Sequence, residues 1–126
     1  VPQAVISHET ALTVHDLSDV MPAVVHLTVP PGFRKSTPAG CVLYRANLAP
    51  TDSEQRIGFK VTTPLRTLVD VAESALSQEH LDRAARDALQ HGLVRRPALA
   101  TVACSSAARA RLDQALAAAL TEESSP

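Results

Sequence analysis

The five histidines are the residues most able to carry catalysis or bind a metal, but their spacing builds no familiar reactive site. His8 and His15 lie seven residues apart on one predicted helix, so they share a face about 10 Å apart. That separation is too long for two ligands of one metal ion, and no H-E-x-x-H motif or Cys/His cluster accompanies them. We therefore expect no catalytic residue, no metal site and no cofactor.

A metal-dependent nuclease is the enzyme class that the remaining polar residues could still form. Its set would be Asp52, Glu54 and Lys60. A restriction-type nuclease places its second carboxylate and its lysine two residues apart on one strand. Here six residues separate Glu54 from Lys60, and both carboxylates lie in a linker that contains Pro50. The pattern favours a solvated acidic turn, with a nuclease-like domain kept as an alternative.

The central part of the chain is basic, although the whole chain has a formal net charge of -1. Residues 24–68 contain six basic and two acidic residues, a balance of +4, so the other residues carry -5. Such an asymmetry indicates a charged face. Five of these cations are predicted to contact DNA or another anion: Arg34, Lys35, Arg45, Lys60 and Arg66. No segment resembles a recognition helix, so a merely solvated face is the competing interpretation.

Short elements must position this basic stretch. Residues 1–6 are predicted to be extended, and residues 7–17 to form a helix with Ser7 as its N-cap and Asp19, Met21 and Pro22 at its end. Strands are expected over residues 24–29, 41–46 and 56–61, with a basic loop after Pro30-Pro31-Gly32. Because each connection is too short for a crossover helix, we expect a mainly antiparallel three-stranded sheet.

The second half of the chain has helical periodicity. Thr63 followed by Pro64 predicts a helix start, and Ser77 predicts another. A short helix is expected from Arg96 to Val102 and a last one over residues 106–120, with Leu112, Leu116 and Leu120 on one face. The order predicts an α+β fold: an N-terminal helix, a small sheet, then three or four helices.

Length and composition fit one domain. The 126 residues are 45% hydrophobic and only 2% aromatic, so the core must consist of Leu, Val and Ala. We expect a single domain over residues 1–120 and a frayed polar tail over residues 121–126.

Cys41 and Cys104 have no metal-ligand spacing and are predicted to be buried thiols. No apolar run is long enough to span a membrane, so a cytoplasmic protein is expected.

Several segments taken in order resemble the AbiEi family of type IV antitoxins, which also act as transcriptional repressors. The resemblance covers residues 5–99. It is carried by SHETAL and HDLSDV (residues 7–12 and 15–20), HLTVPPGFR (26–34), LYRANL (43–48), VTTPLRTLVD (61–70) and ALQHGLV (88–94). Their order and spacing together are more specific than any one segment.

The resemblance implies an antitoxin domain that follows an upstream winged helix-turn-helix domain, which binds operator repeats. The implied partners are DNA and a nucleotidyltransferase-like toxin, which a type IV antitoxin can counter without a stable complex. It implies no catalytic residue. Two alternatives stay open: a nuclease-like domain acting on nucleic acid, and an interaction domain that packs through its C-terminal helices.

Overall fold

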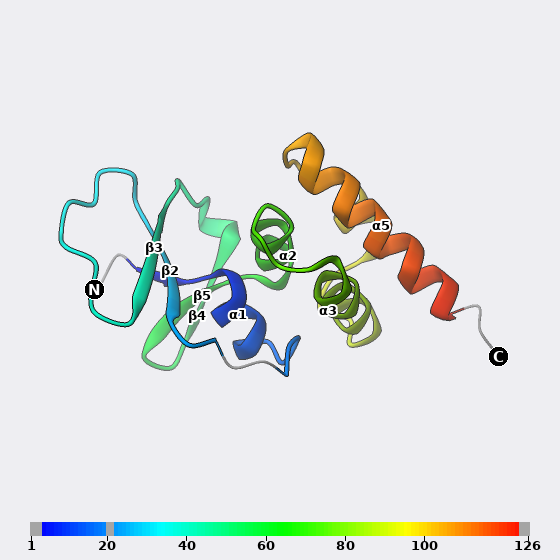
Figure 1. Ribbon diagram of the computed structural model, residues 1–126, viewed down its shortest axis with the longest axis horizontal. Helices are drawn as coiled ribbons and strands as arrows, with labels where there is room; N and C mark the ends of the chain where they lie inside the picture. The colour runs from blue at the N-terminus through cyan, green and yellow to red at the C-terminus, as the bar shows by residue number, and fades with distance from the viewer. Residues whose placement is uncertain (1–3, 20–21, 124–126) are drawn as a thin grey trace.

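The computed structural model describes residues 4–19 and 22–123, and it separates the chain into a sheet at one end and helices at the other (Figure 1). The elements follow in the order β1 (Val5–Ile6), α1 (His8–Val14), β2 (Val25–Val29), β3 (Cys41–Arg45), η1 (Pro50–Asp52), β4 (Ser53–Arg56), β5 (Phe59–Thr62), α2 (Pro64–Ala72), α3 (Gln78–Gln90), α4 (Arg96–Thr101) and α5 (Ser106–Glu123). The predicted α+β class is confirmed.

The sheet differs from the one predicted. It has five strands in the order β3-β2-β1-β5-β4. The pairs β1/β2 and β4/β5 are antiparallel, whereas β1/β5 and β2/β3 are parallel. The expectation of a mainly antiparallel three-stranded sheet was therefore wrong, and the sheet is mixed.

The parallel pairing of β2 and β3 needs a return connection, which residues 30–40 provide without a helix. A five-residue strand is about 17 Å long, whereas eleven extended residues reach about 36 Å, so this loop can run back along the edge of the sheet. It does so outside β3 (Figure 1), and Val25 pairs with Cys41 while Val29 pairs with Arg45. The antiparallel prediction was wrong because it assumed a helix in every parallel connection.

Two further strands were missed. The predicted strand over residues 56–61 is part of a hairpin, in which Glu54 pairs with Val61 and Gly58 turns the chain with φ +84°. The predicted extended segment at residues 1–6 contains β1, which pairs with both β2 and β5 and so lies in the middle of the sheet. Residues 1–3, the predicted helix end at Met21 and the last three residues of the predicted tail lie outside the described residues.

The helix starts were predicted well. The Thr63 hydroxyl accepts a hydrogen bond from the Arg66 amide at 3.3 Å and Pro64 opens α2. The Ser77 hydroxyl accepts a hydrogen bond from the His80 amide at 3.2 Å.

Among the described residues, no helix is both long and apolar enough to cross a membrane. Both thiols are free and half-buried, so Cys41 and Cys104 are less enclosed than expected.

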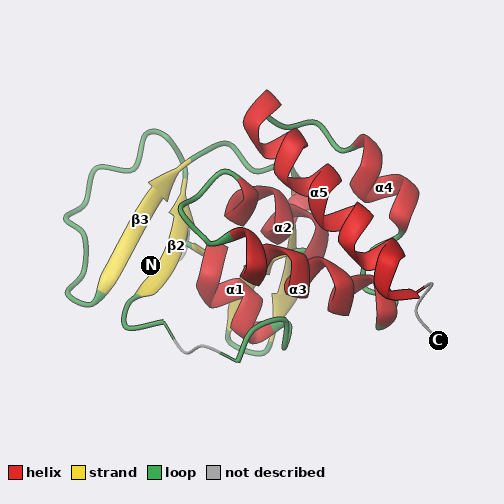
Figure 2. Cartoon of the chain, turned by 45° about the vertical axis from the view of Figure 1, so that its right-hand side comes forward, coloured by secondary structure: helices red, strands yellow, loops and turns green. Residues whose placement is uncertain are grey.

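The core lies where α2, α3 and α5 pack together (Figure 2). Small alanines on α3 and α5 alternate with leucines there, and this allows the helices to approach closely. On these three helices the fully enclosed leucines are Leu68, Leu81 and Leu112. On α5, Leu116 is also buried, but Leu120 is 54% exposed, so the predicted leucine face is covered only in part.

Candidate nucleic-acid interface

Three of the predicted DNA-contacting cations gather at the β3 edge of the sheet. Arg34 and Lys35 lie on the loop of residues 30–40 and are exposed. Arg45, the last residue of β3, donates a hydrogen bond from Nε to the backbone carbonyl of Phe33 at 3.4 Å. This bond ties the loop to the strand, so that the two exposed cations lie next to Arg45. Within the described residues, neither Arg34 nor Lys35 has an ion-pair partner.

Lys60 lies three strands away on β5, about 14 Å from the β3 backbone at the usual spacing of about 4.8 Å. It is exposed and, like Arg34 and Lys35, has no ion-pair partner in the described part of the chain. A groove of about 350 Å³ joins it to the β3 side, because Pro30 and Ala46 line the same hollow as Lys60. Of the five predicted cations, Lys60 lines this groove, and Arg45 directly precedes Ala46, which lines it from the β3 side.

Arg66 is placed differently. It donates from Nε to Oδ1 of Asp70 at 2.9 Å, one turn further along α2, and its Nη1 lies 3.8 Å from Oδ2 of Asp52. The side chain is 27% exposed. The sequence suggests a cation in need of an anionic partner, and the fold supplies two such partners from within the chain.

Asp70 is itself an unusual carboxylate. Its side chain is 6% exposed, and Oδ2 is buried without a hydrogen-bond partner among the described residues. Burial raises the pKa of Asp70 from 3.8 to about 6, against the opposing effect of the Arg66 guanidinium. The Arg66–Asp70 pair is therefore a structural contact whose carboxyl group takes up a proton more readily than usual.

A second polar cluster, which sequence reasoning missed, joins the start of α1 to the sheet. The Thr28 hydroxyl donates to Ser7 Oγ at 2.8 Å, and Ser7 Oγ is 2.8 Å from His8 Nδ1. The His8 ring stacks on Tyr44 with centroids 3.7 Å apart. Ser7 precedes α1 as predicted, but its hydroxyl binds these partners and does not cap the helix. The only signal in the sequence was that these residues fall in the segments that carry the family resemblance.

The Ser7–His8 pair is built for structure and not for nucleophilic catalysis. Ser7 has no exposed surface, so no substrate can reach its hydroxyl. His8 has a left-handed backbone with φ +54°, a conformation that costs a non-glycine residue on the order of 1–2 kcal/mol. Burial lowers the pKa of His8 to about 4, with smaller effects from His26 and Arg66, so the ring is neutral at pH 7.

A comparison with protein-family models shows which family the chain belongs to. The model of the AbiEi antitoxin C-terminal domain matches residues 3–122. The chain belongs to the AbiEi antitoxin family. Comparison with curated proteins gave no match. The predicted family is confirmed over nearly the whole chain, and because these antitoxin domains are a non-enzymatic family, the chain is not an enzyme.

The residues of the nuclease alternative, Asp52 and Glu54, have separate contacts in this AbiEi domain. Asp52 accepts a hydrogen bond from the Ala49 amide at 2.9 Å in addition to its contact with Arg66. Glu54 Oε1 lies 3.7 Å from His15 Nε2 and 3.9 Å from Arg56 Nη2. The two carboxylates are thus held by different partners. In the described ranges, no three His, Cys, Asp or Glu side chains lie close enough to bind a metal ion.

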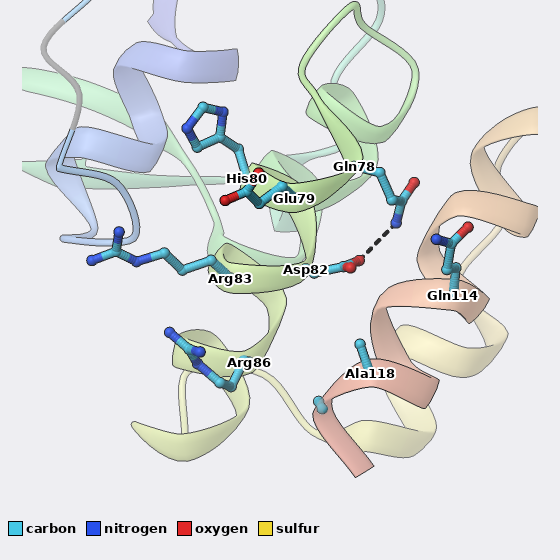
Figure 3. Close-up of a pocket in the computed structure, with 9 residues that line it drawn as sticks. Gln78, Glu79, His80, Asp82, Arg83, Arg86, Gln114 and Ala118 are labelled. Carbon is cyan, nitrogen blue, oxygen red and sulfur yellow. Dashed lines mark hydrogen bonds between the residues drawn. The ribbon is translucent and has the colours of Figure 1, made fainter. Parts of the chain in front are cut away.

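Another hollow of this AbiEi domain, about 540 Å³ in volume, lies between α3 and α5 (Figure 3). Gln78 Nε2 donates to Asp82 Oδ1 at 2.7 Å on the side that faces Gln114 and Ala118. The cations at its border are already paired, Arg83 with Asp19 and Arg86 with Asp87. Because its charges are compensated within the chain, this hollow is a weaker candidate for an anion site than the groove beside Lys60.

Proposed function

We propose that this domain is the antitoxin part of a type IV toxin–antitoxin system in the bacterial cytoplasm, where it counters a nucleotidyltransferase-like toxin. The observation that carries this proposal is the match of the AbiEi antitoxin C-terminal domain to residues 3–122. Antagonism here needs no stable complex with the toxin, which fits a domain whose free charges are directed to another partner. An upstream winged-helix domain would supply the operator sequence readout.

We further propose that the domain assists autoregulation by contacting DNA through Arg34, Lys35, Arg45 and Lys60, referred to below as the basic surface. Phosphate contacts by Lys and Arg position a protein on DNA and are independent of sequence. Three of these cations have no ion-pair partner in the described part of the chain, and Arg45 bonds only to a backbone carbonyl. Arg66, the fifth predicted contact, contributes less because Asp52 and Asp70 already compensate its charge.

The basic surface is tested by measuring duplex binding over a series of salt concentrations. Removing one cation that touches a phosphate should lower the slope of log K against log salt by about 0.9. Lys35→Ala should therefore reduce both affinity and slope, whereas Arg95→Ala should change neither. Arg95 is a suitable control because it is also exposed and has no ion-pair partner among the described residues, but lies at the start of α4. Equal effects of the two variants would contradict the proposal.

The antitoxin role is tested by co-expressing the full-length protein with the toxin of the neighbouring gene. Growth rescue by the wild type, and its loss when residues 4–123 are deleted, is the expected result. Rescue that survives the deletion would show that this domain is not the antitoxin part.

One observation favours a second candidate, an interaction surface on the C-terminal helix. Leu120 is 54% exposed on α5, close in sequence to Ala118 and Ala119, which line the hollow beside α3. If α5 docks on a toxin or an upstream domain, Leu120→Lys should abolish growth rescue while DNA affinity is unchanged. Unchanged rescue would remove this candidate.

A further inference from the structure

The groove between β3 and Lys60 is large enough to hold a small ligand group. Its volume of about 350 Å³ falls at the lower end of the range of roughly 300–1,000 Å³ for ligand pockets. Val5, Thr28 and Val29, all buried residues, line it along β1 and β2. The wall at the β3 side is the connection that leads from Ala46 to Pro50, which includes the half-buried Leu48.

Two polar side chains lie at this groove with unused hydrogen-bonding capacity. Asn47 and Ser53 both line it, and in the described part of the chain neither side chain makes a hydrogen bond. An amide side chain offers both a donor and an acceptor, and a hydroxyl offers both as well. Such groups match the edge of a nucleobase, which also carries donors and acceptors side by side.

Cations border the groove on both sides. Lys60 lines it on the β5 side. Arg45 immediately precedes Ala46 on the β3 side, and only its Nε is engaged, by the Phe33 carbonyl. The terminal nitrogens of Arg45 therefore remain available. A hollow lined by both apolar and polar groups, with a cation on either side, offers contacts for a base and for the phosphates that flank it in a single strand.

We infer that this groove binds an unstacked base of single-stranded nucleic acid, with Asn47 and Ser53 at the base edge and Lys60 and Arg45 at the flanking phosphates. This inference rests on the proposed nucleic-acid contact and names the form of nucleic acid that the basic surface prefers. A base inside a duplex is stacked on both faces and paired at its edge, so it cannot enter a concave site. Extruding it first costs a few kcal/mol, which a single strand does not have to supply.

The test compares the affinities of the domain for labelled oligodeoxythymidine, oligouridine and a duplex of equal length, by fluorescence anisotropy. Ala49→Leu narrows the groove without a change of charge, and because Ala49 is exposed the fold should tolerate it. Ala100→Leu makes the same change at an exposed position of α4 and serves as the control. A thermal melt of each variant checks folding. Asn47→Ala separately removes the amide at the base edge.

We expect the wild type to bind the single strands more tightly than the duplex. Ala49→Leu should lower the single-strand affinity about tenfold, the scale of one base contact, and leave duplex affinity unchanged. Oligouridine bound in preference to oligodeoxythymidine would identify RNA as the source of the base, and the reverse would identify DNA.

The inference is overturned if the duplex binds as tightly as the single strands, or if Ala49→Leu and Asn47→Ala have no more effect than Ala100→Leu. In those cases the phosphate contacts of the proposed function would stand, because they depend only on salt-sensitive duplex binding. If no nucleic acid binds at all, both fail.

Discussion

Arg66 Nε bonds to one oxygen of Asp70 at 2.9 Å, while the other oxygen of the same carboxylate is buried without a partner in the described part of the chain. Burial also lowers the pKa of His8, and the charge of Arg66 lowers it further, so the His8 ring is neutral at pH 7. The two groups titrate in the same pH range with opposite consequences for stability.

The first prediction concerns Asp70. Its pKa is raised from 3.8 to about 6 in the folded protein, so the folded state holds this proton more tightly and loses stability as the pH rises from about 4 to about 6. His8, with its pKa lowered from 6.5 to about 4, has the opposite effect, because its stabilisation is present above 6.5 and is lost as the pH falls. Asp70→Asn removes the Asp70 effect, so the His8 effect is no longer offset by it. Its free energy of unfolding should rise by on the order of 3 kcal/mol from pH 4 to pH 7, as measured by urea denaturation.

The second prediction is the mirror experiment on His8. His8→Asn keeps a residue that tolerates the left-handed backbone at φ +54° but removes the titrating ring. The Asp70 effect is then no longer offset by His8, and the free energy of unfolding should fall between about pH 4 and pH 6. The wild type should show a much flatter dependence than either variant. If all three proteins have parallel pH profiles, the two groups do not titrate as described.

The third prediction concerns Arg111 on α5, which closes the carbonyl end of α2. Its Nη1 donates to the carbonyls of Ala72 and Ser74, both at 2.9 Å, and its Nε donates to Gln78 Oε1 at 3.2 Å. A lysine cannot reproduce this planar set of donors. Arg111→Lys should lower the free energy of unfolding by about 2 kcal/mol, as measured by urea denaturation.

Arg95→Lys is the control for Arg111, since Arg95 is exposed and its side chain makes no hydrogen bond or ion pair within the described residues. It should change the stability by less than about 0.5 kcal/mol. A similar drop in stability in both variants would mean that the carbonyl contacts of Arg111 add nothing specific.

The fourth prediction compares two glycines. Gly58 turns the β4–β5 hairpin with φ +84°, and a Cβ atom built there meets nothing within 4 Å. Gly58→Ala should therefore cost about 1 kcal/mol through backbone strain alone. At Gly32 a Cβ is equally free of contacts and the backbone is not left-handed, so Gly32→Ala should be neutral or slightly stabilising. Chemical denaturation of both variants checks this, and an equal cost at the two positions would contradict it.

The parts of the fold that could be predicted from the sequence are those that depend on residues close together along the chain. The start of α2 follows from Thr63 and Pro64, and the start of α3 follows from Ser77, because capping acts over one turn. Strand pairing depends on residues far apart, so the position of β1 between β2 and β5 could not be read from its two residues.

The candidate site divides in the same way. The contact of Arg66 with Asp70 joins residues four apart on one helix, a spacing visible in the sequence, and it could have been predicted. Its contact with Asp52 could not, because the fold alone brings η1 beside α2. Likewise, the groove between Ala46 and Lys60 exists only once β3 and β5 have taken their places in the sheet.

The pairing of Ile6 with Val61 also has a consequence for synthesis on the ribosome. The central strand leaves the exit tunnel early, but its parallel neighbour is made 55 residues later, since 61 minus 6 is 55. Until then β1 can pair only with β2, and its other edge is open to foreign strands. Closure of the sheet is thus a late, non-local event that slows folding relative to the helices. A nascent chain arrested shortly before residue 59 should be protease-sensitive, and one that exposes β5 and α2 outside the tunnel should be protected.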